Sequence, residues 1–525
     1  MSESQEPPPP APKKRRFSLA GLIPWPRRPS ESADKETAEK KAPRKRGRFT
    51  LAQLAAERRR LIISFTAGLI VLLAIQIPEV EQSFLGAPDR EMMETAMKLR
   101  ADLIRGTADP VLFMDIDDRT LTQYEPKQGT FALPPATTPR GLIADLLDYI
   151  RTGPPDSMPR VVILDVDIAQ PASDGPDGVA KLQTVLANWA KTPAAPPLVI
   201  SRESYPAVAF GITSPALALP DTPYDATVQP APNIYWSTAK VLGDQNGEIR
   251  EFVPFECVLS STGMKPLYSG ALISYEFIER DPKVLDKAAA KHWMRDGATH
   301  CQTQPNVKLQ HGERIDYHFS LDLGFANRSW PNLDPAWPGF KACTETDSAI
   351  FMRLSAIDIV NAFRAGGDVS RGPLCQHVVI IGGTNTSAGD FVQTPLNEMN
   401  GSAVLANAVR GLQLTHGGLR PIPLILQVLL LAMASLAMSA SSLATSRARH
   451  HYRRLRRSPH RRHLVRRVQI ILLNPILVNG IIALAAHGIG IGLLLVSLNF
   501  GLWGFLSAPV FAAAITETVQ EFADG

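Results

Sequence analysis

The chain has 525 residues, of which 45% are hydrophobic and 20% are charged, and it carries a formal net charge of +5. This length leaves room for one large folded domain together with membrane helices. The charge is unevenly distributed, because ten arginines and no acidic residue lie between residues 444 and 468 while the middle of the chain is net acidic. Such asymmetry is typical of nucleic-acid-binding tails or of membrane proteins, and the long apolar runs of this chain exclude the first class.

Residues 1–60 form a basic, proline-rich tail, which we expect to be mostly disordered and cytoplasmic. Three uncharged apolar runs occur further along the chain. A helix that crosses roughly 30 Å of hydrocarbon needs about 17–25 apolar residues, so the third run is long enough to cross twice, folding back at His487 and Gly488. We therefore predict four transmembrane helices, with three as the alternative. They cover residues 61–78, 421–446, 468–487 and 489–516.

Arginine positions orient these helices. Arg58, Arg59 and Arg60 come directly before the first predicted span, and the arginine cluster lies in the loop 447–467 between the second and third spans. Because basic residues are retained on the cytoplasmic side, we expect both chain ends, including the short tail 517–525, to be cytoplasmic. The acidic section, residues 79–420, is then outside the cytoplasm. The basic loop is expected to contact anionic headgroups of the lipid bilayer, with no nucleic acid as partner.

All four cysteines, Cys257, Cys301, Cys343 and Cys375, fall in the section 79–420. An extracytoplasmic compartment permits disulfides, and four cysteines allow three connectivities between which sequence cannot choose. A pairing of Cys301 with Cys343 is favoured, since both flank a loop-like stretch rich in Pro, Asn and Trp. The cysteine and histidine spacing matches no zinc site, and we expect neither a metal nor a cofactor.

Strand-like and helix-like stretches alternate through this section in chain order. Apolar runs predict buried strands at residues 111–116, 160–166, 197–201 and 376–381. Helical periodicity predicts helices at residues 138–150, 179–189, 355–365 and 405–412. Asn246-Gly247 predicts a hairpin turn. We therefore predict a single layered α/β domain with a largely parallel sheet, inserted between one N-terminal and three C-terminal transmembrane helices.

An ordered series of short motifs runs through the domain. A strand with an acidic turn lies at 111–121, Pro139-Arg140 starts a helix, and a second strand lies at 161–166. A turn with Gly and Arg occupies 246–250. The most specific motif is the run 379–384, followed by Gly389, Asp390, Thr394, Pro395, Gly401 and Asn407. In this order the motifs resemble the CHASE2 family of bacterial extracytoplasmic sensory domains.

The resemblance implies a multi-pass protein of the bacterial inner membrane, whose large periplasmic domain senses a ligand or an envelope protein. Such domains usually feed a cytoplasmic kinase or nucleotide cyclase placed after the last span, which the tail 517–525 is too short to hold. We therefore expect signalling through a separate cytoplasmic partner. A structural or scaffold subunit of an envelope or surface-assembly complex is the alternative. No enzymatic activity is expected, since the sequence has no GxSxG elbow.

Carboxylates at predicted strand ends are the first ligand-binding candidates. Asp115, Asp117 and Asp118 follow the strand 111–116, and α/β proteins bind ligands at the carboxyl ends of their strands. The alternative role for Asp117 or Asp118, which we favour, is to cap the next helix. We expect Arg140 to pair with these carboxylates through charge-assisted hydrogen bonds.

A second group of candidates closes the domain. Glycines after the last predicted strand suit a tight strand exit, and anion binding there is the alternative. Asp390 and Thr394 are expected to fix that loop by hydrogen bonds. The remaining candidates are Asp165, Gly382, Gly383 and Thr384.

Overall fold

The computed structural model describes the α/β domain and parts of the helices around it, with gaps between them. The described residues are 51–75, 87–101, 111–124, 137–206, 209, 217–243, 247–260, 263–279, 301, 313–315, 351–365, 374, 377–385, 390–415, 419–433, 436, 488, 491–498 and 502–503.

Six parallel strands form the central sheet, in the order β12-β1-β13-β2-β3-β6. The prediction of a largely parallel sheet is thus confirmed, and four of its strands lie where the apolar runs predicted them. The two others, β6 and β12, were not predicted. The strands are β1 (Val111–Asp115), β2 (Val161–Asp165), β3 (Leu198–Ser201), β6 (Ile234–Ser237), β12 (Phe351–Ser355) and β13 (Val378–Gly382).

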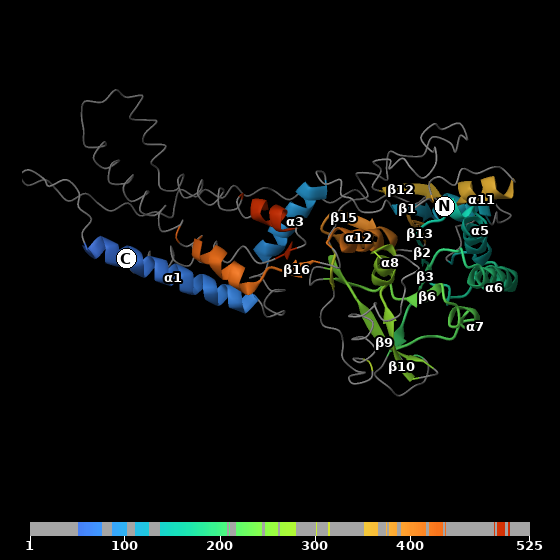
Figure 1. The fold of residues 1–525 in the computed structure, drawn as a ribbon, viewed down its shortest axis with the longest axis horizontal. Coiled ribbons are helices and arrows are strands. Elements are labelled where there is room, and N and C mark those ends of the chain that lie inside the picture. Colours follow the sequence, from blue (N-terminus) through green and yellow to red (C-terminus); the bar gives the residue numbers. More distant parts are fainter. Residues whose placement is uncertain are drawn as a thin grey trace, which may run out of the picture. The chain divides into compact units, whose positions relative to one another are not determined.

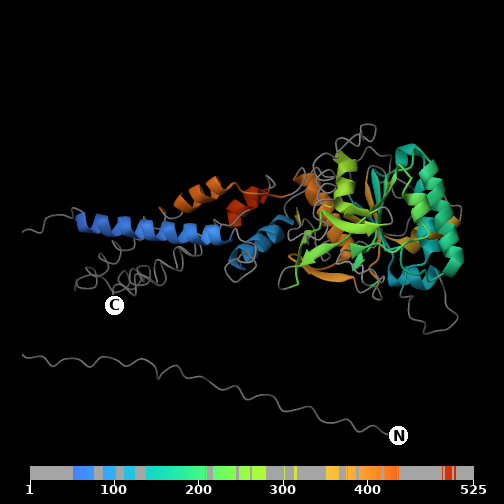
Figure 2. The ribbon, with the colours of Figure 1, turned by 90° about the horizontal axis from the view of Figure 1, so that it is seen from below.

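Helices cover both faces of this sheet, which is why its strands are apolar on both sides. Figures 1 and 2 show the sheet between two helical layers. Alternate residues of each strand face opposite layers, as Leu112 and Phe113 of β1 do by joining different hydrophobic clusters. One layer contains α4 (Asp118–Tyr124), α5 (Arg140–Arg151), α6 (Gly175–Lys191), α7 (Asp225–Val228) and α11 (Ala356–Arg364), and the other α8 (Gly270–Glu279) and α12 (Gly401–Leu414).

The predicted helices are confirmed, and two of them, α6 and α12, are longer than expected. The helix predicted at 405–412 is α12, which begins four residues earlier because Asn400 caps it. The Asn400 side chain accepts a hydrogen bond from the backbone N–H of Ala403 at 3.1 Å. This earlier start brings Gly401 and Ser402 into the first turn of the helix, next to the ends of the sheet strands.

Smaller sheets extend the domain. The hairpin predicted around Asn246-Gly247 is confirmed, because β7 and β8 pair antiparallel and Gly247 has a φ of 81°. Asn246 itself lies outside the described residues. One sheet has the order β10-β9-β5-β4, another β11-β8-β7, and β14 and β15 form a hairpin. These strands are β4 (Tyr205–Pro206), β5 (Leu217–Ala218), β7 (Val241–Gly243), β8 (Ile249–Phe252), β9 (Phe255–Ser260), β10 (Gly263–Tyr268), β11 (Glu313–Arg314), β14 (Phe391–Thr394) and β15 (Asn397–Asn400).

A disulfide joins Cys257 of β9 to Cys301, with Cα atoms 5.3 Å apart. The predicted pairing of Cys301 with Cys343 is therefore wrong. Flanking a loop is a weak guide to pairing, because a disulfide requires the Cα atoms to lie roughly 4.4–6.8 Å apart in space. Cys343 and Cys375 lie outside the described residues.

The helix α3 (Ala87–Ala101) packs on the domain. Met92, Met93 and Met97 are buried in the hydrophobic cluster that also holds residues of α12 and β8. Glu94 of the same helix lies 3.9 Å from Arg250 of β8. A cavity of about 10 Å³, lined by Met93, Met97, Arg250, Ile315 and Pro395, lies at this contact. It has room for roughly one water molecule.

The described residues of the apolar segments outside the domain are mostly helical. They include α1 (Leu51–Ile75) and residues 424–433 and 491–498. In the described part of the chain, no helix combines the length and apolarity that a membrane crossing requires. The predicted span 468–487 lies outside the described residues. Within the predicted span 489–516, Leu502–Trp503 forms strand β17, which pairs with β16 (Arg420–Pro421), so this stretch differs from one continuous helix.

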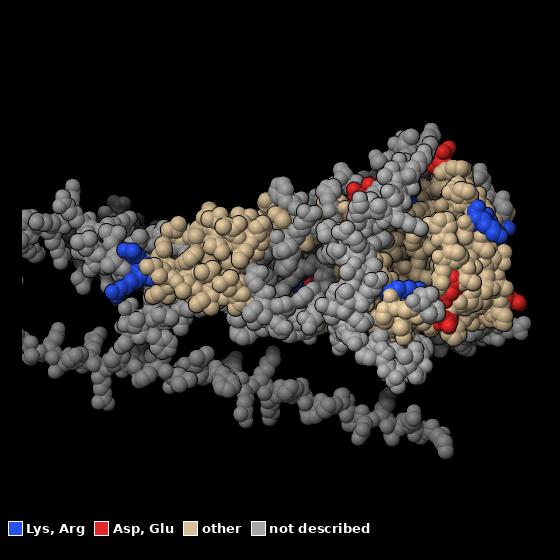
Figure 3. Space-filling model, turned by 60° about the horizontal axis from the view of Figure 1, so that its bottom comes forward, with Lys and Arg blue, Asp and Glu red and all other residues tan. Residues whose placement is uncertain are grey.

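These helices expose apolar side chains. Val71 and Leu72 of α1 pack against Leu431, while other large apolar residues remain on the surface. Figure 3 shows the broad uncharged surface that results, with basic residues beside it. The exposed set includes Ile62, Ile63, Ile70, Leu73, Leu424, Ile425, Leu429, Met433, Leu493 and Val496.

Candidate functional site

The parallel register brings the predicted site residues to one edge of the sheet. Asp115 at the end of β1 is opposite Ser355 on one side and Gly382 on the other, and Gly382 is in turn opposite Asp165. This carboxyl edge is where α/β sheets present their ligand sites. It holds two groups of polar side chains. We call them the Asp115 cluster (Asp115, Arg353 and Thr384) and the Asp165 cluster (Asp165, Ser201, Asp390 and Ser402).

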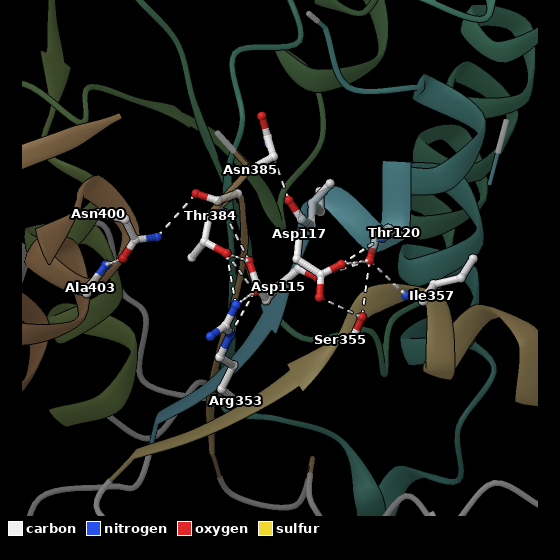
Figure 4. A network of polar contacts seen from close by, with 12 residues as sticks. Asp115, Asp117, Thr120, Arg353, Ser355, Ile357, Thr384, Asn385, Asn400 and Ala403 are labelled. Atoms are coloured by element: carbon white, nitrogen blue, oxygen red, sulfur yellow. Dashed lines mark hydrogen bonds and ion pairs between the residues drawn. The ribbon is translucent and has the colours of Figure 1, made fainter. Parts of the chain in front are cut away.

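In the Asp115 cluster a fully buried carboxylate is paired with an arginine (Figure 4). Arg353 donates from Nε to Asp115 at 2.7 Å and also from Nη2. Thr384 donates its backbone N–H at 2.9 Å and its hydroxyl at 2.8 Å. Burial raises the pKa of Asp115, while Arg353 and Thr384 act in the opposite direction. The cluster ties β1, β12 and the end of β13 together.

Asp117 caps helix α4. Its carboxylate accepts from the backbone N–H of Thr120 at 2.7 Å and from the Thr120 hydroxyl at 2.6 Å. It also accepts from Ser355 at 3.1 Å. Asp118 is the first residue of the helix. The capping alternative is therefore confirmed for Asp117 (Figure 4).

Removal of this cap is expected to destabilise the folded protein. The variant Asp117→Ala should lower the free energy of unfolding by about 1 kcal/mol, because one helix N–H loses its acceptor. The matched control Asp118→Ala should cost less, since this side chain is not the N-cap. Denaturant titration of the purified protein measures both. Equal costs for the two variants would contradict the capping role.

Arg140 does not pair with the strand-end carboxylates, so that prediction is wrong. Its guanidinium is buried and donates to the backbone carbonyls of Thr138 at 2.9 Å, Asp167 at 3.2 Å and Gln170 at 2.6 Å. Arg353 from β12 is the partner of Asp115 instead. Arg140 thus fixes the loop that follows β2.

The Asp165 cluster lies beside the first turn of α12. Asp165 accepts from Ser201 at 3.1 Å and from Ser402 at 2.7 Å. Burial raises its pKa, and the two hydroxyl donors act against this rise. Gly382 lies directly against Ser402, since a Cβ at this position would be 2.0 Å from the serine Oγ. The glycine is thus required for close packing of β13 against α12, whereas the sequence had suggested a conformational reason.

Asp390 completes this cluster at the start of β14. A Cβ on Gly401 would lie 2.4 Å from a carboxylate oxygen of Asp390, so this carboxyl packs directly on the helix start. The residue as a whole is exposed, but its carboxyl is packed against the start of the helix. Desolvation of this carboxyl and the charge of Asp165 raise the pKa of Asp390 to about 7.

Thr394 and Gly383 have structural contacts. The Thr394 hydroxyl donates to the carbonyl of Asn397 at 2.6 Å and accepts from the N–H of Leu396 at 3.2 Å, which fixes the turn between β14 and β15. Among the described residues these contacts lie in the turn between β14 and β15, and not in the loop after β13 that Thr394 was expected to fix. The carbonyl of Gly383 accepts from the side chain of Asn400 at 3.2 Å, and this bond holds the exit of β13 against α12.

Four site residues were not predicted: Arg353, Ser201, Ser402 and Asn400. For Arg353 the available signal was a single charge inside the apolar run 351–355. A lone arginine in a buried strand needs a partner, and a strand-end carboxylate is the natural one. Ser402 and Asn400 had no comparable signal, because their importance depends on where α12 begins.

The geometry of the edge bears on two possible roles, metal binding and ligand binding. Among the described residues, no three His, Cys, Asp or Glu side chains gather in a way that could hold a metal ion. Most polar atoms of the Asp115 cluster already have partners within the protein.

A comparison with protein-family models shows to which family the chain belongs. The model of the CHASE2 domain matches residues 66–444. The chain belongs to the CHASE2 family. CHASE2 domains are extracellular sensory domains, so the resemblance noted in the sequence is confirmed and a sensory role is supported. Comparisons with curated proteins and with solved structures gave no match.

Proposed function

We propose that this CHASE2 protein is a membrane-anchored, non-enzymatic receptor. Its α/β domain would lie outside the cytoplasm and respond to a ligand or an envelope protein at the carboxyl edge of the six-stranded sheet. The signal would then pass to a separate cytoplasmic partner. The observation that carries the proposal is the gathering of the Asp115 and Asp165 clusters at this edge, in a family of sensory domains.

Membrane anchoring is supported by the exposed apolar side chains of α1 and of residues 424–433. An uncharged surface of this kind is unfavourable in water and is suited to lipid. Arg58 and Arg59, both exposed, lie on α1 next to its apolar stretch. The disulfide between Cys257 and Cys301 supports an oxidising compartment for the domain.

Cysteine labelling in intact spheroplasts tests this topology. The native disulfide is kept, Cys343 and Cys375 are replaced by serine, and a single cysteine is added as Asp221→Cys or Arg454→Cys. A membrane-impermeant maleimide should label the first variant and leave the second unlabelled until the membrane is permeabilised. Labelling of Arg454→Cys alone would show that the domain faces the cytoplasm, and the receptor proposal would fail.

A scaffold subunit of an envelope assembly is the second candidate. It is favoured by the saturation of Asp115, whose oxygens already accept from Arg353 and Thr384 and so leave little for a ligand. Purification of the full chain in mild detergent distinguishes the two functions. A stoichiometric complex of envelope proteins would indicate the scaffold, whereas a co-purifying kinase or cyclase would indicate the receptor.

A further inference from the structure

Two carboxyl groups meet at the start of α12. Asp165 at the end of β2 accepts from Ser402 at 2.7 Å, and Asp390 packs against the adjacent Gly401. Because Gly401 and Ser402 are consecutive residues of one helical turn, both carboxyls lie within the same small region. The two acids come from parts of the chain more than 200 residues apart, and the fold alone brings them together.

This pair differs from the neighbouring buried acid. Asp115 has Arg353 as counter-charge, whereas among the described residues no ion pair involves Asp165 or Asp390. The titratable groups that face Asp390 are Asp165 from β2 and Glu203 from the loop after β3, and both are acidic. Helix α12 adds only Gly401, Ser402 and its N-terminal dipole. Two crowded carboxyls without a cation resist simultaneous ionisation.

Asp390 is connected to α3 through the hairpin β14–β15. It directly precedes β14, and its carbonyl accepts from the N–H of Gly401 at 3.0 Å, which closes the hairpin. Gln393 of β14 is bridged to Glu248, and Pro395 at the turn lines the small cavity beside Met93 and Met97 of α3. A shift of Asp390 relative to α12 would therefore change the packing of α3 against the hairpin.

We propose that the protonation state of the Asp165–Asp390 pair sets the position of the hairpin β14–β15 against α12 and, through Pro395, the packing of α3. The pH outside the cytoplasm would then be an input to this domain. The protonated pair tolerates close packing at Gly401, and the fully ionised pair pushes the hairpin away. The inference deepens the proposed receptor function by naming a regulator of its edge, and it rests on that function for its biological direction.

The pH range and the sign follow from linkage. The pKa of Asp390 is raised from 3.8 to about 7, so the folded protein holds a proton that the unfolded chain has released. Its contribution to stability is therefore fully present below pH 3.8 and is lost as the pH rises through about 7. The variant Asp390→Asn, whose side chain cannot ionise, should not lose stability in this pH range.

Hydrogen exchange of the full chain in detergent tests the inference, at about pH 5.5 and about pH 8.5 with times scaled to the intrinsic exchange rate. In the wild type, amides of residues 391–405 and 92–101 should exchange several-fold faster at the higher pH. The variant Asp390→Asn should show low-pH protection at both values. Asp165→Asn, which removes the other charge of the pair, should show the same protection. Agreement between the two variants would exclude an effect of local misfolding in one of them.

The matched control is Asp221→Asn, an exposed aspartate in the loop before α7, which should retain the wild-type pH response. A wild type without a pH response in these segments would overturn the inference, and so would a response that persists in Asp390→Asn. Neither result would touch the labelling or co-purification experiments, so failure of the pH inference is separable from failure of the receptor proposal.

Discussion

Replacement of Arg353 by methionine is expected to lower the free energy of unfolding by about 3–5 kcal/mol, the cost typical of leaving one partner of a buried ion pair uncompensated. Asp115 is fully buried and receives two of its hydrogen bonds from this guanidinium. Methionine preserves much of the apolar stem but supplies neither charge nor donors. Chemical denaturation of the purified protein at neutral pH measures the loss.

The loss should depend on pH in a defined direction. Without Arg353 the pKa of Asp115 rises further, because burial is then opposed mainly by Thr384. A neutral Asp115 needs no counter-charge, so the variant should be closest to the wild type in acid and should lose stability as the pH rises through the new pKa. A second substitution, Asp115→Asn, should restore much of the lost stability.

The matched control for this pair is Arg119→Met. Arg119 forms an ion pair with Asp358, but the two side chains are 52% and 42% exposed. Exposed pairs contribute about 0–1 kcal/mol, so this variant should unfold close to the wild type. Similar losses for Arg119→Met and Arg353→Met, or an Arg353→Met loss independent of pH, would show that Asp115 is not the group being compensated.

The sequence patterns predicted the core of the fold because β1, β2, β3 and β13 are continuous apolar runs with both faces buried. The strand β12 was missed because Arg353 interrupts its apolar pattern. The strand β6 was missed because its sequence, Ile-Tyr-Trp-Ser, has a single aliphatic residue and its two middle residues are only half-buried. In both cases the strand forms because neighbouring strands and helices cover it, and this information is not local in the sequence.

The site was also predicted only in part, because the partners of its residues depend on contacts that are distant in the sequence. Strand-end residues such as Asp115, Asp165 and Thr384 follow from recognising strands, and parallel strands present their carboxyl ends at one edge. The partner of Asp115 depends on β12 being the neighbour of β1, a pairing across 238 residues. Arg140 is nearer in sequence, but the loop carbonyls after β2 take its donors. Sheet order, rather than sequence distance, decides the ion pair.

The cysteines illustrate how three-dimensional proximity overrules local context. Cys301 pairs with Cys257 of β9, in a small buried cluster that includes Phe255. The stretch between Cys301 and Cys343 had suggested a closed loop, but the strand that receives Cys301 lies before it in the chain. The pair closes a loop with a sequence separation of 44 residues.

Loss of this disulfide is the second large effect that we expect. In the chain-entropy account, a cross-link over 44 residues removes about 4 kcal/mol of unfolded-state freedom. The double variant Cys257→Ser/Cys301→Ser should therefore melt roughly 8–16 °C lower than the wild type, measured on the full chain in detergent. Wild type treated with a membrane-permeant reductant should converge on the same midpoint, and the double variant should not respond to reductant through this pair.

The disulfide also connects stability to location. Thiols stay reduced in most cytoplasms, so a chain whose domain lies outside the cytoplasm should yield the peptide linked by Cys257 and Cys301 in non-reducing digests. The same chain expressed in a strain that lacks periplasmic thiol oxidase should carry free thiols and show the lower midpoint of the double variant. An oxidised pair that forms equally well without the oxidase, or a double variant that melts with the wild type, would remove the support that this bond gives to an extracytoplasmic domain.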